Sequence, residues 1–237
     1  MYHSIIFGDK NTWADWFLIP TSRPVFNPPV PKTKFVDIPG ADYHLDLSTS
    51  LTGDIAYEAR KGSFEFIVDN GHKEWADLYS EIMDYLHGKL LKATLEDEPV
   101  YYYEGRFEVN EWKSERYNSK IVIDYTVAPY KYETYSSLED WIWDTFNFET
   151  GIVREYKELK VDGKLEFVIV GRRMSVTPSF IVKSNDGKGL KVTFNGVTHD
   201  LPDGTSRVIN IKTVEGENTL TFTGNGTVSI DYRGGRL

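Results

Sequence analysis

Two groups of acidic residues have the side chains that glycosidases use, so they are the first candidates for chemistry. The string EDEP places three acids at 96–98, and Asp140 and Asp144 flank a pair of tryptophans. A glycosidase needs two carboxyl groups held on either side of one sugar bond. The acids at 96–98 run into a proline, which is typical of a solvated turn, and Asp144 could equally cap the turn that follows it. We therefore expect no acid pair and no catalysis here.

Other residue types that carry chemistry are absent or scattered. The chain has no cysteine, which excludes disulfides, thiolate metal ligands and thiolate nucleophiles. It shows no Ser/His/Asp pattern, Gly-rich phosphate loop or zinc-ligand spacing. His72 and His87 lie about four helical turns apart and cannot share a metal ion. We predict no catalytic residue, no cofactor and no metal site; the other histidines are His3, His44 and His199.

Six tryptophans could form a stacking platform for sugar, but their positions favour core and interface roles. Trp13 and Trp16 lie in a terminal segment, where aromatic residues often anchor subunit contacts. With Phe17 they form our first set of interface candidates. Lys113 and Arg116 form the second set, because they lie in a charged turn that a neighbouring subunit could touch.

The stretch VNEWKSERYNSKIVIDYTVAPYKY, residues 109–132, has the composition of a binding patch but the pattern of a sheet. Apolar residues alternate along GRFEVNEW and along KIVIDYTVA. The segment between them supplies turn residues, with Asn118 and Ser119 at its centre. Pro129 then stops the ladder. We predict a β-hairpin over residues 105–128 whose aromatic rings pack across strands and in the core.

Length and charge limit the classes of protein that fit. The chain has 237 residues, 40% hydrophobic and 27% charged, enough for one large or two small domains with their own cores. No apolar run approaches the roughly 20 residues of a membrane span, and the N-terminus lacks the pattern of a signal peptide. A formal net charge of −9 argues against gripping the outside of a nucleic-acid helix. An acidic surface does let nucleic acid pass without sticking.

The first half indicates a β domain with a helix. Six prolines between Pro20 and Pro39 exclude a helix there and indicate extended chain along a surface or between neighbours, with a linker as the alternative. TKFVDI and YHLDLS alternate like short strands within it. GSFEFIVDN predicts a longer strand. Helical spacing of apolar residues then predicts a helix over about 71–87, with Asn70 as N-cap and Gly88 after its end.

The second half indicates a different β domain. From Gly151 on, turn pairs separate short β-prone runs at the spacing of an all-β sandwich or jelly roll. We expect an N-terminal domain over 1–132, an aromatic linker over 133–150, and a C-terminal domain over 151–237. The predicted turn pairs are Asp162-Gly163, Asp186-Gly187, Asn195-Gly196, Asp203-Gly204 and Asn225-Gly226, and the predicted strands are KLEFVIV, SFIVKS, LKVTFNG, RVINIK, NTLTFTG and TVSIDY.

Several strings, in order and nearly end to end, match one protein family. They are FGDKNTWADWFLIPTSRP, VDIPGAD with LDLSTSLTG, GSFEFIV, EWADLYSEIMDYLHGK, YYYEGRFEVNEWKSERYNSKIVIDYTVAPYKY, WIWDTFNFETG and GNGTVSIDYRGGRL. Together they resemble the distal tail protein (Dit) of long-tailed, non-contractile phages and prophages. The chain looks like the short form of that family, because no long insertion separates these strings.

The resemblance implies a fold and a role. It implies an N-terminal β-sandwich with one helix, which builds a hexameric ring, and a C-terminal galectin-like jelly roll. The ring would join the tail tube protein to the tail-associated hub or lysin protein and, in phages with a baseplate, hold receptor-binding proteins. Such a protein is structural and non-enzymatic, is made in the bacterial host cytoplasm, and ends in the virion at the tail tip. DNA would be passing cargo only, and no membrane is involved.

A carbohydrate-binding module is the alternative function. A galectin-like domain has sugar-binding relatives by shape, although a shared fold does not decide function. FNGVTHDL offers Asn195 and His199 as polar ligands, but no tryptophan occurs after Trp143. That weakens the case for a sugar site in the second domain.

Overall fold

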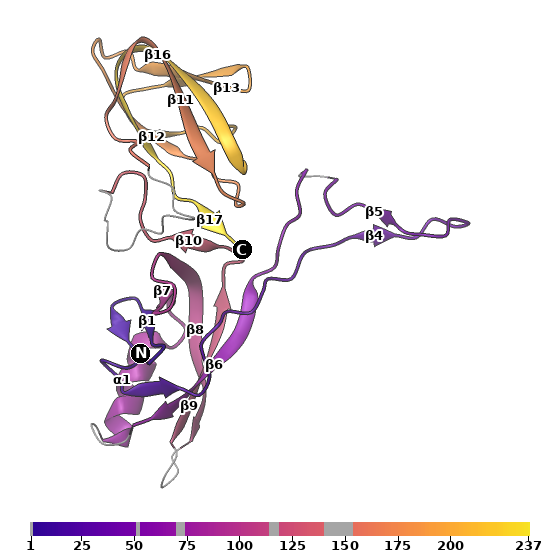
Figure 1. The fold of residues 1–237 in the computed structure, drawn as a ribbon, viewed down its shortest axis with the longest axis vertical. Helices are drawn as coiled ribbons and strands as arrows, with labels where there is room; N and C mark the ends of the chain where they lie inside the picture. The colour runs from indigo at the N-terminus through magenta and orange to yellow at the C-terminus, as the bar shows by residue number, and fades with distance from the viewer. Residues whose placement is uncertain (1, 51–52, 70–73, 114–118, 140–153) are drawn as a thin grey trace. The chain divides into compact units, whose positions relative to one another are not determined.

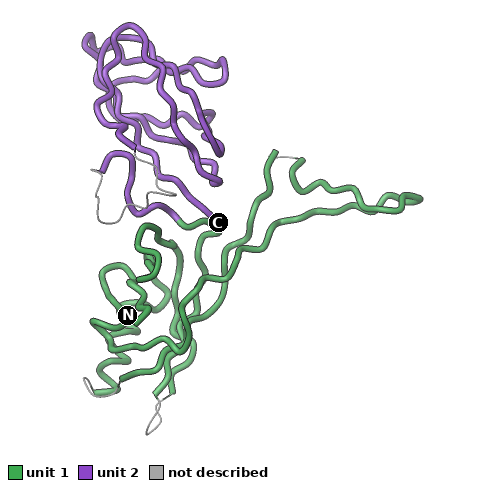
Figure 2. The backbone as a smooth tube through the Cα atoms, in the orientation of Figure 1, with its two compact units in different colours: residues 1–131, 237 green, residues 132–236 purple. Residues whose placement is uncertain are grey.

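The computed structural model describes residues 2–50, 53–69, 74–113, 119–139 and 154–237. The fold is mainly β, with one α-helix among these residues, as we expected from the sequence (Figure 1). The chain divides into two compact units, which we call unit 1 (1–131, with 237) and unit 2 (132–236) (Figure 2). Among the described residues no helix is long and apolar enough to cross a bilayer.

Unit 1 is built on a curled antiparallel sheet. Seven strands follow one another across it in the order β2-β1-β7-β8-β9-β6-β3. Their bounds are β1 Ile5–Phe7, β2 Lys10–Asn11, β3 Leu18–Pro20, β6 Arg60–Val68, β7 Leu90–Leu95, β8 Tyr101–Lys113 and β9 Lys120–Val127. Along β6 the predicted alternation is confirmed, because Phe64, Phe66 and Val68 are buried while the residues between them are not.

The helix α1, Trp75–Leu86, covers the buried face of this sheet. Leu78, Ile82 and Leu86 recur at helical spacing and are all buried. The helix ends where we predicted, since Gly88 adopts φ +72°, the left-handed conformation that a glycine after a helix end supplies. The predicted start near residue 71, with Asn70 as N-cap, was wrong: the helix begins at Trp75, and Glu74 occupies the N-cap position without a side-chain capping hydrogen bond.

The predicted hairpin is confirmed and its aromatic content is explained. β8 and β9 pair from Gly105–Val127 to Lys113–Lys120, with one register shift between Val109 and Glu111. Trp112 is packed against the helix, its ring 4.3 Å from that of Trp75. The aromatic rings within residues 109–132 therefore stabilise unit 1 from within, and residues 114–118 of the predicted turn lie outside the described part.

Unit 2 is a second antiparallel sheet, curled around its own core as in a jelly roll. The strands run β14-β13-β16-β12-β15, and β11 pairs with β16. Their bounds are β11 Leu159–Gly171, β12 Ser179–Ser184, β13 Leu190–Phe194, β14 Val197–Leu201, β15 Gly204–Arg207 and β16 Gly216–Asp231. Two expectations were wrong: RVINIK is not a strand, and NTLTFTG and TVSIDY form the single strand β16.

We predicted two strands where β16 is one, and the reason lies in two pairs of turn-forming residues that face each other. Asp162 pairs with Asn225, and Gly163 with Gly224, in the middle of the long β11–β16 ladder. Both glycines have positive φ, +72° and +124°. The Asn225 side chain accepts a hydrogen bond from the Gly163 amide at 3.0 Å. These residues bend two paired strands where we had predicted that they would end them.

Residues 133–139, predicted as linker, belong to unit 2. Glu133 ends β10 (Lys131–Glu133), which pairs with β17 (Gly235–Arg236). The Glu133 carboxylate is ion-paired with Arg154 and with Arg172, the latter at 3.2 Å. The Ser137 hydroxyl donates to the Ile230 carbonyl at 2.6 Å. Residues 140–150 of the predicted linker lie outside the described part.

Candidate interaction arm

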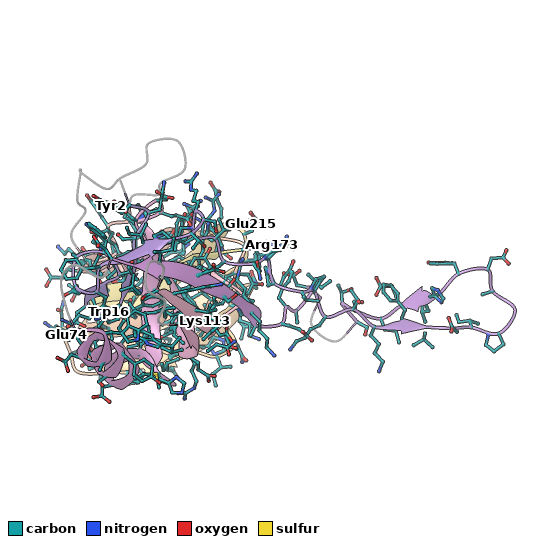
Figure 3. The ribbon with its side chains drawn as sticks, turned by 90° about the horizontal axis from the view of Figure 1, so that it is seen from below. Tyr2, Trp16, Glu74, Lys113, Arg173 and Glu215 are labelled. Carbon is teal, nitrogen blue, oxygen red and sulfur yellow. The ribbon has the colours of Figure 1, made fainter. Side chains whose placement is uncertain are left out.

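Between β3 and β6 the chain leaves the body of unit 1 and returns, forming a long projection (Figure 1). We call residues 27–59 the arm. No described residue of the arm is buried, whereas Phe26 and Arg60 on either side of it are. Figure 3 shows side chains standing out along the arm. The extended chain predicted from the prolines is confirmed, and its exposure makes it the candidate site.

Phe26 anchors the start of the arm in the core of unit 1. Its ring stacks on Tyr103 at 3.9 Å and meets Phe64 and Tyr125 edge-on at 5.0 Å and 4.8 Å. Offset stacks and edge contacts of this kind add roughly 0.5–1.5 kcal/mol each beyond burial. Burial also raises the pKa of Tyr103 to about 12. The root of the arm is therefore fixed by one buried aromatic cluster.

Arg60 ties the two ends of the arm together. Its Nη1 donates to the Asn27 carbonyl at 3.0 Å and its Nε to the Pro129 carbonyl at 2.8 Å. The guanidinium also lies 5.5 Å from the centre of the Tyr103 ring. Nη2 has no partner among the described residues, and burial lowers the pKa of Arg60. Carbonyl oxygens and a ring face thus stabilise this cation, without an ion pair to a described carboxylate.

The two segments of the arm pair with each other beyond its root. The Lys32 amide donates to the Ala56 carbonyl, and the Glu58 amide to the Val30 carbonyl, both at 2.8 Å. Farther out, β4 (Phe35–Val36) pairs with β5 (Leu45–Asp46). These strands lie within TKFVDI and YHLDLS, where alternation predicted them. An isolated two-stranded pair is at best marginally stable in water, so the arm suits contact with a partner.

The end of the arm, residues 35–46, is a hairpin that we call the tip. The Ala41 amide donates to the Ile38 carbonyl at 3.0 Å. With Pro39 second and Gly40 third, at φ +83°, this is a type II turn. Pro39 fixes φ at the second position of the turn and Gly40 supplies the positive φ at the third, so this sequence specifies a turn at the end of the arm.

The tip has two chemically different faces. Side chains alternate across a strand, so the pair Val36–Leu45 defines one face and the pair Phe35–Asp46 the other. The face of Phe35 and Asp46 is mixed, because it carries the ion pair of His44 with Asp37 beside Phe35, which is 57% exposed. The apolar face exposes Val36 by 37% and Leu45 by 44%, and in the loop beyond the strands Ile38 and Tyr43 are exposed by 47% and 79%. A contiguous exposed apolar face of this kind marks an interaction site.

The structure separates the interface candidates that we named from the sequence. Trp16 is wholly buried and packs edge-on against Tyr85 at 5.5 Å, so it is a core residue of the single chain. Trp13 and Phe17 stay partly exposed, 6.2 Å apart between ring centres. Lys113 is exposed and pairs with Glu111, and Arg116 lies outside the described residues.

The sequence missed the tip as a site because exposed apolar residues look like ordinary strand residues. The alternation in TKFVDI and YHLDLS was visible, but alternation normally means that one face is buried. The available signal was the cluster of prolines around these short strands. Proline-rich chain forms few hydrogen-bonded strands, so few neighbouring strands could cover the exposed side chains.

The acids at 96–98 hold unit 1 together, which excludes the freely solvated turn that we expected. Glu96 accepts from the Ser4 amide at 2.7 Å, and Glu98 pairs with Lys131 at 2.5 Å. Asp97 accepts from His3 at 2.9 Å and from Arg23 at 2.7 Å. Burial alone would raise the pKa of Asp97, but these two hydrogen bonds outweigh it and hold the pKa below its usual value.

The remaining candidates for chemistry do not converge. No group of three or more His, Cys, Asp or Glu residues among the described ones could hold a metal ion. Asn195 and Gly196 both have positive φ and form the two-residue turn between β13 and β14. His199 lies opposite Val192 within that hairpin. Asp140 and Asp144 lie outside the described residues.

Comparison with known proteins finds this fold among solved structures. No family model matches the sequence, and no curated protein matches it. Among solved structures, the chain is similar to the crystal structure of SPP1 Dit, described as a paradigm of the hub adsorption apparatus in phages that infect Gram-positive bacteria. The match covers 98% of this chain and 99% of that one, with a TM-score of 0.60 and 12% identity. Both chains therefore share one fold, and the fold implied by the sequence resemblance is confirmed.

Proposed function

We propose that this protein is a distal tail protein, a structural subunit of the ring at the tip of a phage tail. The fold shared with SPP1 Dit along 98% of the chain carries the proposal, because it includes both units and the arm between β3 and β6. The ordered strings of the sequence resemblance support it independently. The ring joins the tail tube protein to the tail-associated proteins that reach the host.

Unit 1 with its arm is the ring-forming part of the proposal. Six copies arranged head to tail would each present one arm and receive one, which is a heterologous contact that closes into a ring. The exposed apolar face of the tip supports such a contact, because a single chain leaves it in water. The acidic balance of the chain suits a channel through which DNA slides without binding.

Unit 2, with its jelly-roll fold, is the docking module for other tail-tip proteins, including receptor-binding proteins where a baseplate is present. The protein acts by assembly and not by catalysis, within the virion. This assignment agrees with the roles of its acids, since Glu96, Asp97, Glu98 and Glu133 are engaged in structural hydrogen bonds and ion pairs.

Mass in solution tests the ring. Light scattering should give about 164 kDa, six times 27.3 kDa, or a multiple of it, and negative-stain images should show six-fold particles. A variant that replaces residues 28–58 with a short Gly-Ser link should be monomeric, and the link is feasible because Arg60 bonds directly to Asn27. A natural chain that stays at 27.3 kDa at every concentration would contradict the proposal.

A further inference from the structure

The chain that leaves unit 1 is bonded to the root of the arm. After β9 the backbone runs through residues 128–131, which we call the exit segment, and unit 2 follows it. The Ala128 amide donates to the Glu104 carbonyl at 2.9 Å, which holds the start of this segment on the sheet. The next carbonyl, that of Pro129, accepts from the guanidinium of Arg60, the residue that follows the arm. The exit segment and the arm therefore share an anchor.

Arg60 fixes two carbonyl groups relative to each other. Its guanidinium is a planar, rigid fork of donors. Nη1 bonds the Asn27 carbonyl at 3.0 Å, where the arm begins, and Nε bonds the Pro129 carbonyl at 2.8 Å. The remaining nitrogen, Nη2, is buried and has no partner among the described residues. A shift of either carbonyl would leave a second donor of this buried cation unpaired, which carries a desolvation penalty, so the two bonds form and break together.

A second contact joins the same two segments. Tyr57, in the returning half of the arm, meets Tyr130 of the exit segment edge-on, with the ring centres 6.0 Å apart. Tyr57 also forms a bridge with Pro31 across the arm. The amides of Lys32 and Glu58, on either side of that bridge, donate to carbonyls of the opposite half at 2.8 Å. Tyr57 thus takes part both in the pairing of the arm and in the contact with the exit segment.

We infer that the arm and the exit segment order together, so that an arm seated on a neighbouring subunit also holds the chain that leads to unit 2. Arg60 and Tyr57 are the positioning residues of this device. In a single chain the arm is a two-stranded pair of marginal stability, so the order of Tyr57 depends on a pairing that a partner strengthens. Order imposed on the arm is then not lost again at the exit segment. The inference rests on the proposed function for the partner, whereas the coupling itself belongs to the single chain.

Hydrogen exchange at single amides, followed by NMR in the dilute chain, measures the coupling. Arg60→Lys keeps the charge, but one amine does not reproduce the fork that spans both carbonyls. Exchange should become about ten-fold faster both at Ala128, in the exit segment, and at Lys32, in the arm. Arg23→Lys is the matched control, because Arg23 of the same unit bonds Asp97 at 2.7 Å, and both amides should exchange as in the natural chain. Acceleration at only one of the two amides, or at neither, would overturn the inference.

Tyr130→Ala perturbs the device from the other side. It removes a half-buried ring and leaves the core intact. Exchange at the Lys32 amide should become about three-fold faster or more, because the Tyr57 ring loses its edge contact. Tyr57→Ala should likewise accelerate exchange at Ala128. Tyr135→Ala, which removes a 38% exposed tyrosine of unit 2, is the control and should change neither rate. Unchanged Lys32 exchange in Tyr130→Ala would overturn the inference, whatever the lysine variant shows.

Assembly gives the measurement in the oligomer. Over a dilution series of the natural chain, exchange at Ala128 should slow by about ten-fold as the oligomer forms, and Tyr130→Ala should assemble but lose most of this slowing. An oligomer in which Ala128 exchanges at the rate of the monomer would overturn the inference and leave the ring standing. Slowing that Tyr130→Ala keeps in full would assign it to burial in an interface, which also overturns the inference. A monomeric natural chain would overturn the proposed function, and the rates in the single chain would then decide the coupling alone.

Discussion

Replacing Phe26 with alanine should detach the arm from unit 1 and destabilise the unit as a whole. Phe26 is 3% exposed and its ring contacts those of Tyr103, Phe64 and Tyr125. Phe→Ala changes at buried sites cost roughly 3–5 kcal/mol. With a urea slope of about 2 kcal/mol per molar, a loss of about 4 kcal/mol lowers the unfolding midpoint by about 2 M.

The assay is urea unfolding followed by tryptophan fluorescence, to which Trp16 and Trp112 contribute from the core of unit 1. Tyr43→Ala is the matched control, because Tyr43 is an aromatic residue of the same arm that is 79% exposed. Its free energy of unfolding should stay within about 0.5 kcal/mol of the natural chain in the monomer. A Phe26→Ala midpoint equal to that of Tyr43→Ala would refute the idea that the root is fixed by this cluster.

Three further changes test other parts of the structure. The pKa of Asp97 is lowered, so its contribution to stability is present at pH values above the usual pKa of 3.8 and is lost as the pH falls below that value. The stability of Asp97→Asn should therefore depend less steeply on pH below about pH 4. Equal slopes of stability against pH in the variant and the natural chain would argue against this. Tyr103 has a pKa raised to about 12 from 10.0, so the folded state loses stability as the pH rises between these values; Tyr103→Phe should reduce that loss, which absorbance and urea unfolding at alkaline pH can measure. A Cβ on Gly105 would lie 2.3 Å from the Thr126 carbonyl oxygen and 2.4 Å from the Val127 Cα, so Gly105→Ala should cost several kcal/mol by overpacking. Gly187 has φ +71° and open space around it, so alanine there should cost only about 1–2 kcal/mol. Similar thermal midpoints for the two variants would be inconsistent with the packing.

Local alternation predicted those elements that bury one face. The hairpin of β8 and β9 and the strand β6 followed from it, and helical spacing in turn predicted the apolar stripe of α1. The same rules failed at Asp162-Gly163 and Asn225-Gly226, because turn-forming residues also bend paired strands. Which of the two occurs depends on whether another strand offers a partner across the bend, and a single strand's sequence does not contain that information.

The sequence predicted only part of the candidate site. Its prolines indicated an extended segment, but not which side chains that segment exposes. Cross-strand pairing fixes which residues share a face, so the apolar set of the tip emerged only with the pair Val36–Leu45. The uncovered face of the unit 1 sheet is assembled in the same way. Leu90, Arg106 and Lys61 are distant in sequence and come together through the ladders of four strands.

The composition of the arm itself favours contact between molecules over stability within one. A segment with no buried residue at its described positions gains little from the hydrophobic effect, so its order must come from elsewhere. Prolines at 28, 29, 31 and 39 reduce the freedom of the unfolded chain, which lowers the entropy lost on ordering. The buried root at Phe26 and Arg60 fixes where the arm departs. An arm prepared in this way binds a partner with less ordering cost, so replacing Pro28 and Pro29 with alanine should weaken assembly while leaving the folded body of unit 1 unchanged.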